Sequence, residues 1–260
     1  ALPALLFRAL ASRTPSEIWQ PDILLAYGGA TLLVYGATRL IAKRVFKLDP
    51  ACQTLFSFGS TMPNVGFMGL PLIIGLLGTQ ATVPLIVALS KHADGTNPLG
   101  KILRGTLLNP VVIAILTGVA ASILDLRWPD GVDYLLELLG RSAGPAALFA
   151  IGVALVGRPI AENRAELAVM SIAKLVAHPV AVFIAFYSLG TVSGLEAQAV
   201  LLLAGLPTAG NVFVIATTYD RYIVRSSSIV LVTTAVGVIS FSVLTLYIDP
   251  LIAALRPFTP

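Results

Sequence analysis

Apolar residues fill long stretches of this chain, and charged or turn-forming residues fall between them. Nine apolar segments can be drawn, near residues 1–11, 23–45, 51–77, 80–90, 106–124, 132–156, 166–188, 195–219 and 226–248. Most approach the roughly 20 residues that an α-helix needs to cross the hydrocarbon core of a bilayer. No low-complexity linker separates them. The pattern predicts an all-α polytopic membrane protein with a single transmembrane domain over residues 1–260.

The stretch 57–78 is apolar enough for a bilayer, yet helix-breaking residues lie at its centre. These are Pro63, Asn64, Gly66, Gly69 and Pro71. A proline removes a backbone N–H and blocks the helical hydrogen bond to the residue four positions earlier. Freed backbone groups in hydrocarbon need partners, so a broken helix is stable only against other protein or a watery cavity. The pattern predicts a crossover at a mid-membrane transporter site. A kinked structural helix is the alternative interpretation.

An internal repeat favours the crossover. Residues 204–214 contain a second break, in which Pro207 aligns with Pro63 at an offset of 144. Residues 143–152 match residues 1–10 at five of ten positions, at an offset of 142. Five segments separate the copies, so the two copies cross the membrane in opposite directions, as in an inverted-topology repeat.

The repeat also predicts elements that the nine segments do not contain. The segment 106–124 has no repeat partner within the chain, so we expect a further helix before residue 1 in the native protein. The segment 80–90 is about half as long as its partner, 226–248. We expect it to be a half-span or to have lost residues.

The positions of Lys and Arg predict the orientation. If the segments alternate, one side collects eleven basic residues: Arg39, Lys43, Arg44, Lys47, Lys91, Lys101, Arg104, Arg158, Arg164, Arg221 and Arg225. The other side collects three, namely Arg13, Arg127 and Arg256. Cytoplasmic loops carry the excess of basic residues, so the first side is predicted to be cytoplasmic and the C-terminus external.

Composition agrees with a membrane protein and argues against other classes. The chain is 57% hydrophobic and 12% charged, whereas soluble domains carry about 25% charged residues. The net charge of +4 needs no nucleic acid, because the basic residues lie in loops. The one cysteine, Cys52, excludes an internal disulfide. Two histidines without metal-ligand spacing suggest neither an enzyme nor a metal or other cofactor.

Neither predicted crossover contains Asp or Glu between residues 51 and 78 or between 197 and 219. A cation carrier would ordinarily place an acid there, so the substrate is predicted to be anionic or neutral. Broken helices also present N-terminal ends that attract anions. The polar side chains near the breaks are Ser60, Thr61, Asn64, Thr208, Asn211, Thr217 and Thr218. Asn64 and Asn211 are the strongest candidates, although an Asn that only caps a broken helix is the alternative.

Lys174 lies inside the segment 166–188. It could supply a counter-charge to the substrate or bind carbonyls of a broken helix, because charges at depth usually face the bundle interior. Alternatively, it could extend its ammonium to cytoplasmic water. His178, one turn later, either packs beside Pro179 or takes part in proton coupling. The predicted substrate site therefore comprises Ser60, Thr61, Asn64, Gly66, Pro71, Lys174, Pro207, Thr208 and Asn211.

Two motifs resemble the crossovers of the auxin efflux carrier family, which includes plant auxin exporters and many bacterial permeases. Asn64-Val-Gly-Phe-Met-Gly-Leu-Pro-Leu resembles the first, and the run from Leu206 to Tyr219 resembles the second. Three further runs also match family patterns: Leu2-Pro-Ala-Leu-Leu-Phe, Pro145-Ala-Ala-Leu-Phe-Ala-Ile-Gly and Lys174-Leu-Val-Ala-His-Pro. The resemblance spans the chain. The plant members carry a proline at the position of Val212.

The resemblance implies ten helices in two inverted five-helix repeats, about nine of them visible here. It further implies a scaffold and a moving transport part. The scaffold would comprise segments 1–11 and 106–156, and the transport part would comprise segments 23–90 and 166–255.

The resulting hypothesis is a secondary transporter in the cell membrane that moves a small organic anion by elevator-type alternating access. Relatives are associated with malate, malonate or indole-3-acetate. Sodium and a proton are the candidate coupling ions, and the sequence does not decide whether either one is used. A homodimer is one candidate assembly, and the sequence leaves the oligomeric state open. A sodium-coupled bile-acid-type symporter and a non-transporting receptor or channel are the alternatives.

Overall fold

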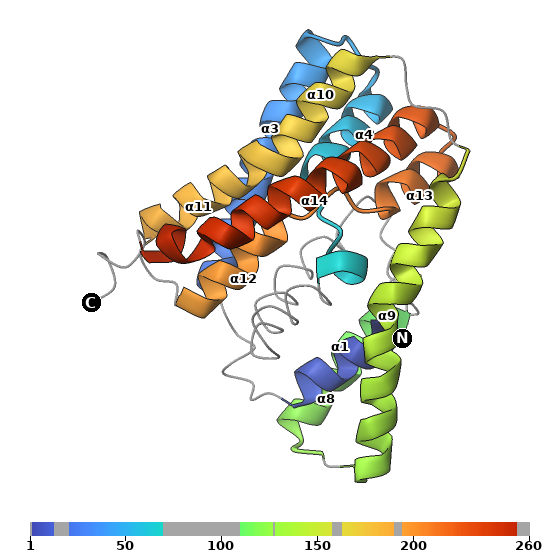
Figure 1. Cartoon of the computed structure of the whole chain (residues 1–260), viewed down its shortest axis with the longest axis vertical. Coiled ribbons are helices and arrows are strands. Elements are labelled where there is room, and N and C mark those ends of the chain that lie inside the picture. Colours follow the sequence, from blue (N-terminus) through green and yellow to red (C-terminus); the bar gives the residue numbers. More distant parts are fainter. Residues whose placement is uncertain are drawn as a thin grey trace.

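The computed structural model describes residues 2–12, 21–69, 110–126, 128–157, 163–189 and 194–253, and every regular element in these ranges is a helix (Figure 1). The elements are α1 (Leu2–Ala11), α3 (Pro21–Arg44), α4 (Pro50–Thr61), η1 (Val65–Gly69), α8 (Pro110–Ile123), α9 (Asp130–Leu155), α10 (Arg164–Ile172), η4 (Ala173–Ala177), α11 (His178–Leu189), α12 (Gly194–Ala204), α13 (Asn211–Thr218) and α14 (Ile223–Ala253). The short elements η1 and η4 are π-helical. The predicted segment 80–90 and Pro71 lie outside the described residues.

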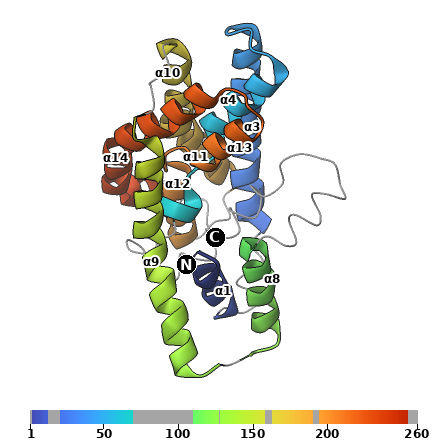
Figure 2. The same cartoon turned by 90° about the vertical axis from the view of Figure 1, so that its right-hand side faces the viewer.

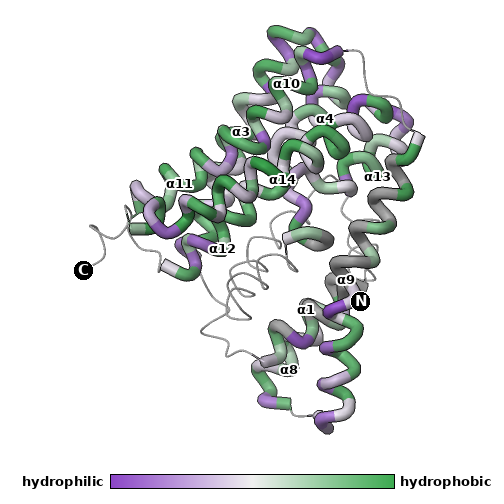
Figure 3. Tube along the Cα trace, in the orientation of Figure 1, coloured by the Kyte–Doolittle hydropathy of each residue, from purple (hydrophilic) through white to green (hydrophobic). Residues whose placement is uncertain are grey.

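Within the described residues, three helical runs are long and apolar enough to cross a membrane: Pro21–Arg44, Arg164–Leu189 and Ile223–Ala253. Figure 3 shows hydrophobic positions along much of α11 and α14. Large apolar side chains such as Leu32 and Leu246 are exposed on the outside of the protein, where lipid would cover them. The all-α, membrane-spanning architecture predicted from the sequence is confirmed.

The helices form two groups (Figures 1 and 2). In one, α1 packs against both α8 and α9; in the other, α3, α4 and α10 to α14 pack together, and η1 contacts α9. Lipid is as apolar as a leucine side chain, so association of such helices depends on close packing rather than on the hydrophobic effect. At Gly118 of α8, an added Cβ would lie 2.9 Å from the backbone oxygen of Phe7. The absence of a side chain at Gly118 therefore sets the distance between α8 and α1.

Two helices of the larger group begin at side-chain caps. The Asp49 carboxylate accepts hydrogen bonds from the backbone N–H groups of Ala51 and Cys52, at 3.0 and 3.2 Å, and Pro50 follows at the first position of α4. A hydrogen bond with the Cys52 side chain, together with these backbone bonds, lowers the pKa of the Asp49 carboxyl. Asn163 caps α10 by accepting from the N–H of Glu166. Both caps satisfy N–H groups that have no partner inside the helix.

The long span Arg164–Leu189 contains one irregular turn, η4, directly before Pro179. A proline inside a helix has no N–H and clashes with the carbonyl four residues earlier. The chain adapts with a wider π turn, in which the N–H of His178 donates to Ala173 O. Such π turns frequently occur at functional sites, and this one contains Lys174.

The core surrounds α12, which is apolar on every side from Ala199 to Ala204. Residues Ala197 and Ala199 to Ala204 are all buried, enclosed by α3, α11 and α14. A helix that is apolar on every side is typical of a bundle centre. The first half of the second crossover is therefore the most enclosed helix of this group.

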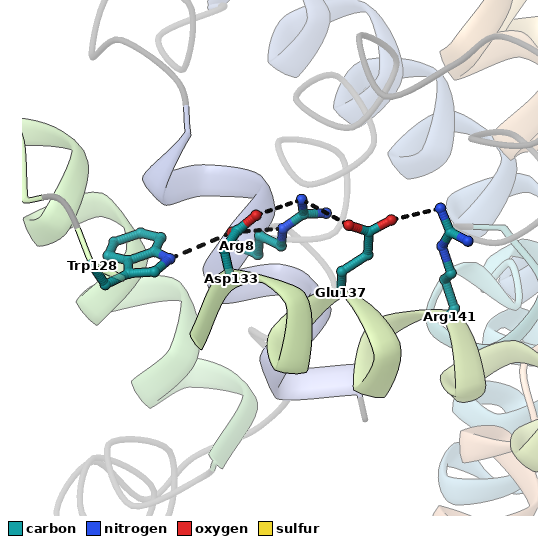
Figure 4. A network of polar contacts seen from close by, with 5 residues as sticks. All are labelled: Arg8, Trp128, Asp133, Glu137 and Arg141. Atoms are coloured by element: carbon teal, nitrogen blue, oxygen red, sulfur yellow. Dashed lines mark hydrogen bonds and ion pairs between the residues drawn. The ribbon is translucent and has the colours of Figure 1, made fainter. Parts of the chain in front are cut away.

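An ion-pair network joins α1 to α9 at the predicted external end (Figure 4). The Arg8 guanidinium binds both carboxylate oxygens of Asp133 at 2.8 Å, and it lies 3.2 Å from Glu137. Trp128 Nε1 donates to Asp133 at 3.4 Å. Glu137 also pairs with Arg141, one helical turn later on α9, at 2.5 Å.

We expect Arg8→Leu to lower the thermal unfolding temperature of the detergent-solubilised protein by a few degrees. The bidentate pair is partly solvated, with side-chain exposures of 33% and 39%, so its loss should cost about 1 kcal/mol. Arg141→Leu is the matched control, because its side chain is 79% exposed and should change the temperature little. Equal shifts in the two variants would contradict a specific role for Arg8.

Candidate functional site

The two broken helices meet at their unwound residues. After α4 the chain is unwound from Met62 to Asn64, and after α12 it is unwound up to Gly210. The two unwound segments pair in an antiparallel bridge between Pro63 and Thr208. The N–H of Asn64 donates to Pro207 O at 2.8 Å, and the N–H of Ala209 donates to Met62 O at 2.9 Å. Each segment therefore supplies the backbone partners that the other lost on unwinding.

The two bridge hydrogen bonds are related by a local two-fold symmetry, so each residue of the first segment has an equivalent in the second segment at a constant separation in sequence. Met62 corresponds to Pro207, and Asn64 corresponds to Ala209, each at a separation of 145 positions. The internal repeat in the sequence predicts an offset of 144, at which Pro207 aligns with Pro63. In the structure Pro63 corresponds instead to Thr208. The two segments run antiparallel at the crossing, as expected for inverted repeats. The bridge relates residues 145 positions apart, one more than the offset of the sequence repeat.

Thr208 is fully buried, and its polar groups are used in packing. Its hydroxyl donates to Gly59 O at 2.7 Å, in the last turn of α4. Its backbone N–H donates to the hydroxyl oxygen of Thr233 on α14 at 3.1 Å. The Thr233 hydroxyl in turn donates to Ile229 O. Thr208 therefore connects both crossovers to α14.

Lys174 binds the other interrupted helix. Its ammonium is fully buried and donates to Ala204 O, the last carbonyl of α12, at 2.7 Å. A cation is favourable at this end of a helix, where carbonyl oxygens lack partners. The interpretation in which Lys174 reaches water is wrong, because η4 turns the side chain into the protein. The sequence allows two other roles for Lys174: a counter-charge to the substrate and a contact with a carbonyl of a broken helix. The structure shows the second.

His178 extends this polar chain to α3. Its Nδ1 lies 3.3 Å from Lys174 Nζ, and its Nε2 lies 3.0 Å from Thr31 Oγ1. The Thr31 hydroxyl donates its single proton to Tyr27 O at 2.7 Å, so we assign Nε2 as the donor to Thr31. With Lys174 present as an ammonium, Nδ1 is then the acceptor for the lysine. His178 thus has specific polar partners, besides packing beside Pro179.

The remaining predicted site residues divide into a buried set near the crossing and an exposed set on α13. Ser60 and Thr61 lie in the last turn of α4, where their hydroxyls donate to the carbonyls of Phe56 and Ser57. Asn64 is only 2% exposed, and its side-chain amide makes no hydrogen bond to any described residue. Gly66 lies in η1.

Asn211 opens α13 and is exposed, and Thr217 and Thr218 are exposed at the other end of that helix. The structure therefore places Ser60, Thr61, Asn64, Pro207 and Thr208 together at the crossing, with Lys174 at the end of α12.

Sequence reasoning did not single out Thr31 and Thr233. Each is a hydroxyl residue inside an apolar span, and that is the signal that could have pointed to them. Such residues often only bond to the preceding turn, and both do so here. Their additional contacts, to His178 and Thr208, depend on tertiary packing.

The electrostatic character of the crossing is positive or neutral. Across the described residues of α4, η1, α12 and α13, the only carboxylate is Glu196, in the first turn of α12. Among the described residues no three His, Cys, Asp or Glu side chains cluster as metal ligands would. The crossing can offer amide and hydroxyl donors together with one ammonium.

A family described as "Membrane transport protein" matches residues 1–93 and 96–245. The chain belongs to this family. The match confirms the resemblance to the auxin efflux carriers that the two crossover motifs indicated. A protein of Rhizobium meliloti (strain 1021) named "Putative malonate transporter" is 34% identical over 259 residues, which cover 92% of this chain and 80% of the relative.

We expect Thr208→Val to lower the thermal unfolding temperature clearly and Thr208→Ser to lower it less. Valine has the shape of threonine but leaves Gly59 O without its donor, and a buried unsatisfied carbonyl costs about 1–3 kcal/mol. Serine keeps the hydroxyl and loses one methyl group. If both variants unfold at the same temperature, the hydrogen bond to α4 is not what makes this position important.

Proposed function

We propose that the protein is a secondary transporter that moves a small carboxylate anion across the cell membrane by alternating access. The observation that carries the proposal is the crossing of two broken helices with a lysine ammonium and without a carboxylate at the break. An anion loses its water on entering such a site and needs preformed donors in return. The relative named as a malonate transporter supports a carboxylate, with malonate the first to test.

Donors for a carboxylate are available at the crossing. The buried amide of Asn64 has no protein partner among the described residues, so its N–H₂ group is free to donate. The ammonium of Lys174 has three N–H donors, and Ala204 and His178 occupy two of them. Asn211 lies at the N-terminus of α13, where a helix dipole favours an anion. We assign substrate contacts to Asn64, Lys174 and Asn211.

The packing of the helices suggests how transport proceeds. α1, α8 and α9 form one group, and the crossovers form their hydrogen bonds within the other group. We propose that the first group is the scaffold and that the second moves against it as a unit, carrying the site from one side to the other.

The proposal predicts uptake of malonate by proteoliposomes that contain the purified protein. Asn64→Ala should lower the uptake rate at limiting malonate at least tenfold, because one or more charge-assisted hydrogen bonds are lost. Thr218→Ala, at an exposed position on α13, is the control and should transport normally. Binding of malonate without flux would indicate a receptor, and conduction far above carrier turnover would indicate a channel. Either outcome would contradict the proposal that the protein is a transporter.

We also expect the uptake rate to stay the same when choline replaces sodium. A sodium ion at the crossing would need oxygen ligands, and Lys174 already places a cation on the last carbonyl of α12. The crossing also lacks the carboxylate that ordinarily accompanies a metal cation in a membrane. Uptake that disappears in choline would contradict this expectation and favour a symporter of the bile-acid type. The malonate assay itself would remain valid in that case.

A further inference from the structure

A basic cleft lies between α3 and α4, near the loop that joins them. It has a volume of about 390 Å³ and is lined by Gly36, Arg39, Leu40, Lys43, Pro50 and Gln53. The α3 residues recur every three or four positions, so they share one face of the helix. The face is open at Gly36, where an added Cβ would meet nothing within 4 Å. The charge distribution along the chain places this end of α3 at the cytoplasmic surface.

Among the described residues, only neutral groups contact the Arg39 guanidinium. Its Nη1 donates to the hydroxyl oxygen of Thr54 on α4 at 2.9 Å and to Tyr35 OH at 3.3 Å. The Thr54 hydroxyl donates to Pro50 O, so its oxygen is an acceptor for the guanidinium. Nε and Nη2 of Arg39 have no partner among the described residues. An arginine fixed at one nitrogen, with other N–H groups available, is suited to bind phosphate at two points.

No carboxylate neutralises the cleft within the described part of the chain. The ion pairs found there involve Arg8, Arg141 and Arg225, and none involves Arg39 or Lys43. The acid nearest in sequence on the cytoplasmic side is Asp49, which caps α4. The cleft therefore keeps two positive charges that its own surroundings do not balance.

An exposed apolar line leads along α3 to these charges. Leu33 and Leu40 are 68% and 49% exposed, and with Gly36 and Lys43 they follow one another at helical spacing. An acyl chain lying along Leu33, Gly36 and Leu40 would place its headgroup between Arg39 and Lys43. Basic pockets between transmembrane helices on the cytoplasmic side are suited to anionic lipid headgroups.

We propose that this cleft binds a phosphate group, supplied by an anionic phospholipid of the cytoplasmic leaflet, that bridges α3 and α4. Arg39 and Lys43 contact the phosphate oxygens, and the exposed face of α3 holds the acyl chain. The site is separate from the crossing, and its occupancy does not depend on which substrate the protein carries. Since α4 leads directly into the first crossover, the lipid stabilises the helix on which the crossing depends.

The test uses the purified full-length chain in nanodiscs of phosphatidylcholine alone or mixed with phosphatidylglycerol, and in detergent with inorganic phosphate. Phosphatidylglycerol should raise the unfolding temperature of the wild type and remain bound in native mass spectrometry. Lys43→Gln and Arg39→Gln should each weaken phosphatidylglycerol binding roughly fivefold, since each surface charge contributes about 1 kcal/mol. Arg44→Gln removes an equal charge outside the cleft and should retain the lipid.

Lys43→Gln keeps the test decisive even if Arg39→Gln fails to fold, because Lys43 is exposed and contacts no described residue through its ammonium. Stabilisation by inorganic phosphate equal to that by the lipid, and lost in Lys43→Gln, would assign the cleft to free phosphate. Equal lipid binding by the wild type and Lys43→Gln would overturn the proposal. An equal loss in Arg44→Gln would do so too, since it would indicate general surface charge.

Discussion

The backbone pairing of the two unwound segments is the interaction on which the larger helical group depends. Helices are stable in a bilayer because every backbone group is satisfied within the helix. Where α4 and α12 are interrupted, backbone N–H and carbonyl groups lose their helical partners. The bridge between Pro63 and Thr208 supplies new partners to several of these groups. Neither crossover can therefore be stable without the other, and the two halves of the sequence must assemble together.

Side chains complete what the bridge leaves unsatisfied, and they come from the second half of the chain. Thr208 binds a carbonyl of α4, and Lys174 binds the last carbonyl of α12. Thr233 on α14 holds the N–H of Thr208 that points out of the bridge. The polar interior of this group is thus used mostly for its own architecture, which leaves few donors for a ligand. Asn64 is the clearest of these.

The sequence predicted the helices and the breaks well, because both are local properties. Long apolar runs define spans, and Pro63 and Pro207 interrupt helices wherever they occur in one. It did not predict the register of the crossing, since backbone hydrogen bonds carry no side-chain signature. Lys174 left two interpretations open for a similar reason. Its partner, Ala204, lies 30 residues away, and only the π turn before Pro179 decides which way the ammonium points.

The register also determines which positions of the bridge tolerate proline. Pro63 stands where an antiparallel bridge uses no N–H, and Pro207 contributes only its carbonyl. The two donors, Asn64 and Ala209, are the positions at which proline would remove a hydrogen bond. Proline, which breaks both helices, is therefore compatible with the bridge at positions 63 and 207. It is not compatible at positions 64 and 209, whose N–H groups form the bridge hydrogen bonds. The two halves therefore place their helix-breaking prolines at different positions of the bridge, Pro63 at its centre and Pro207 beside it, without loss of the pairing.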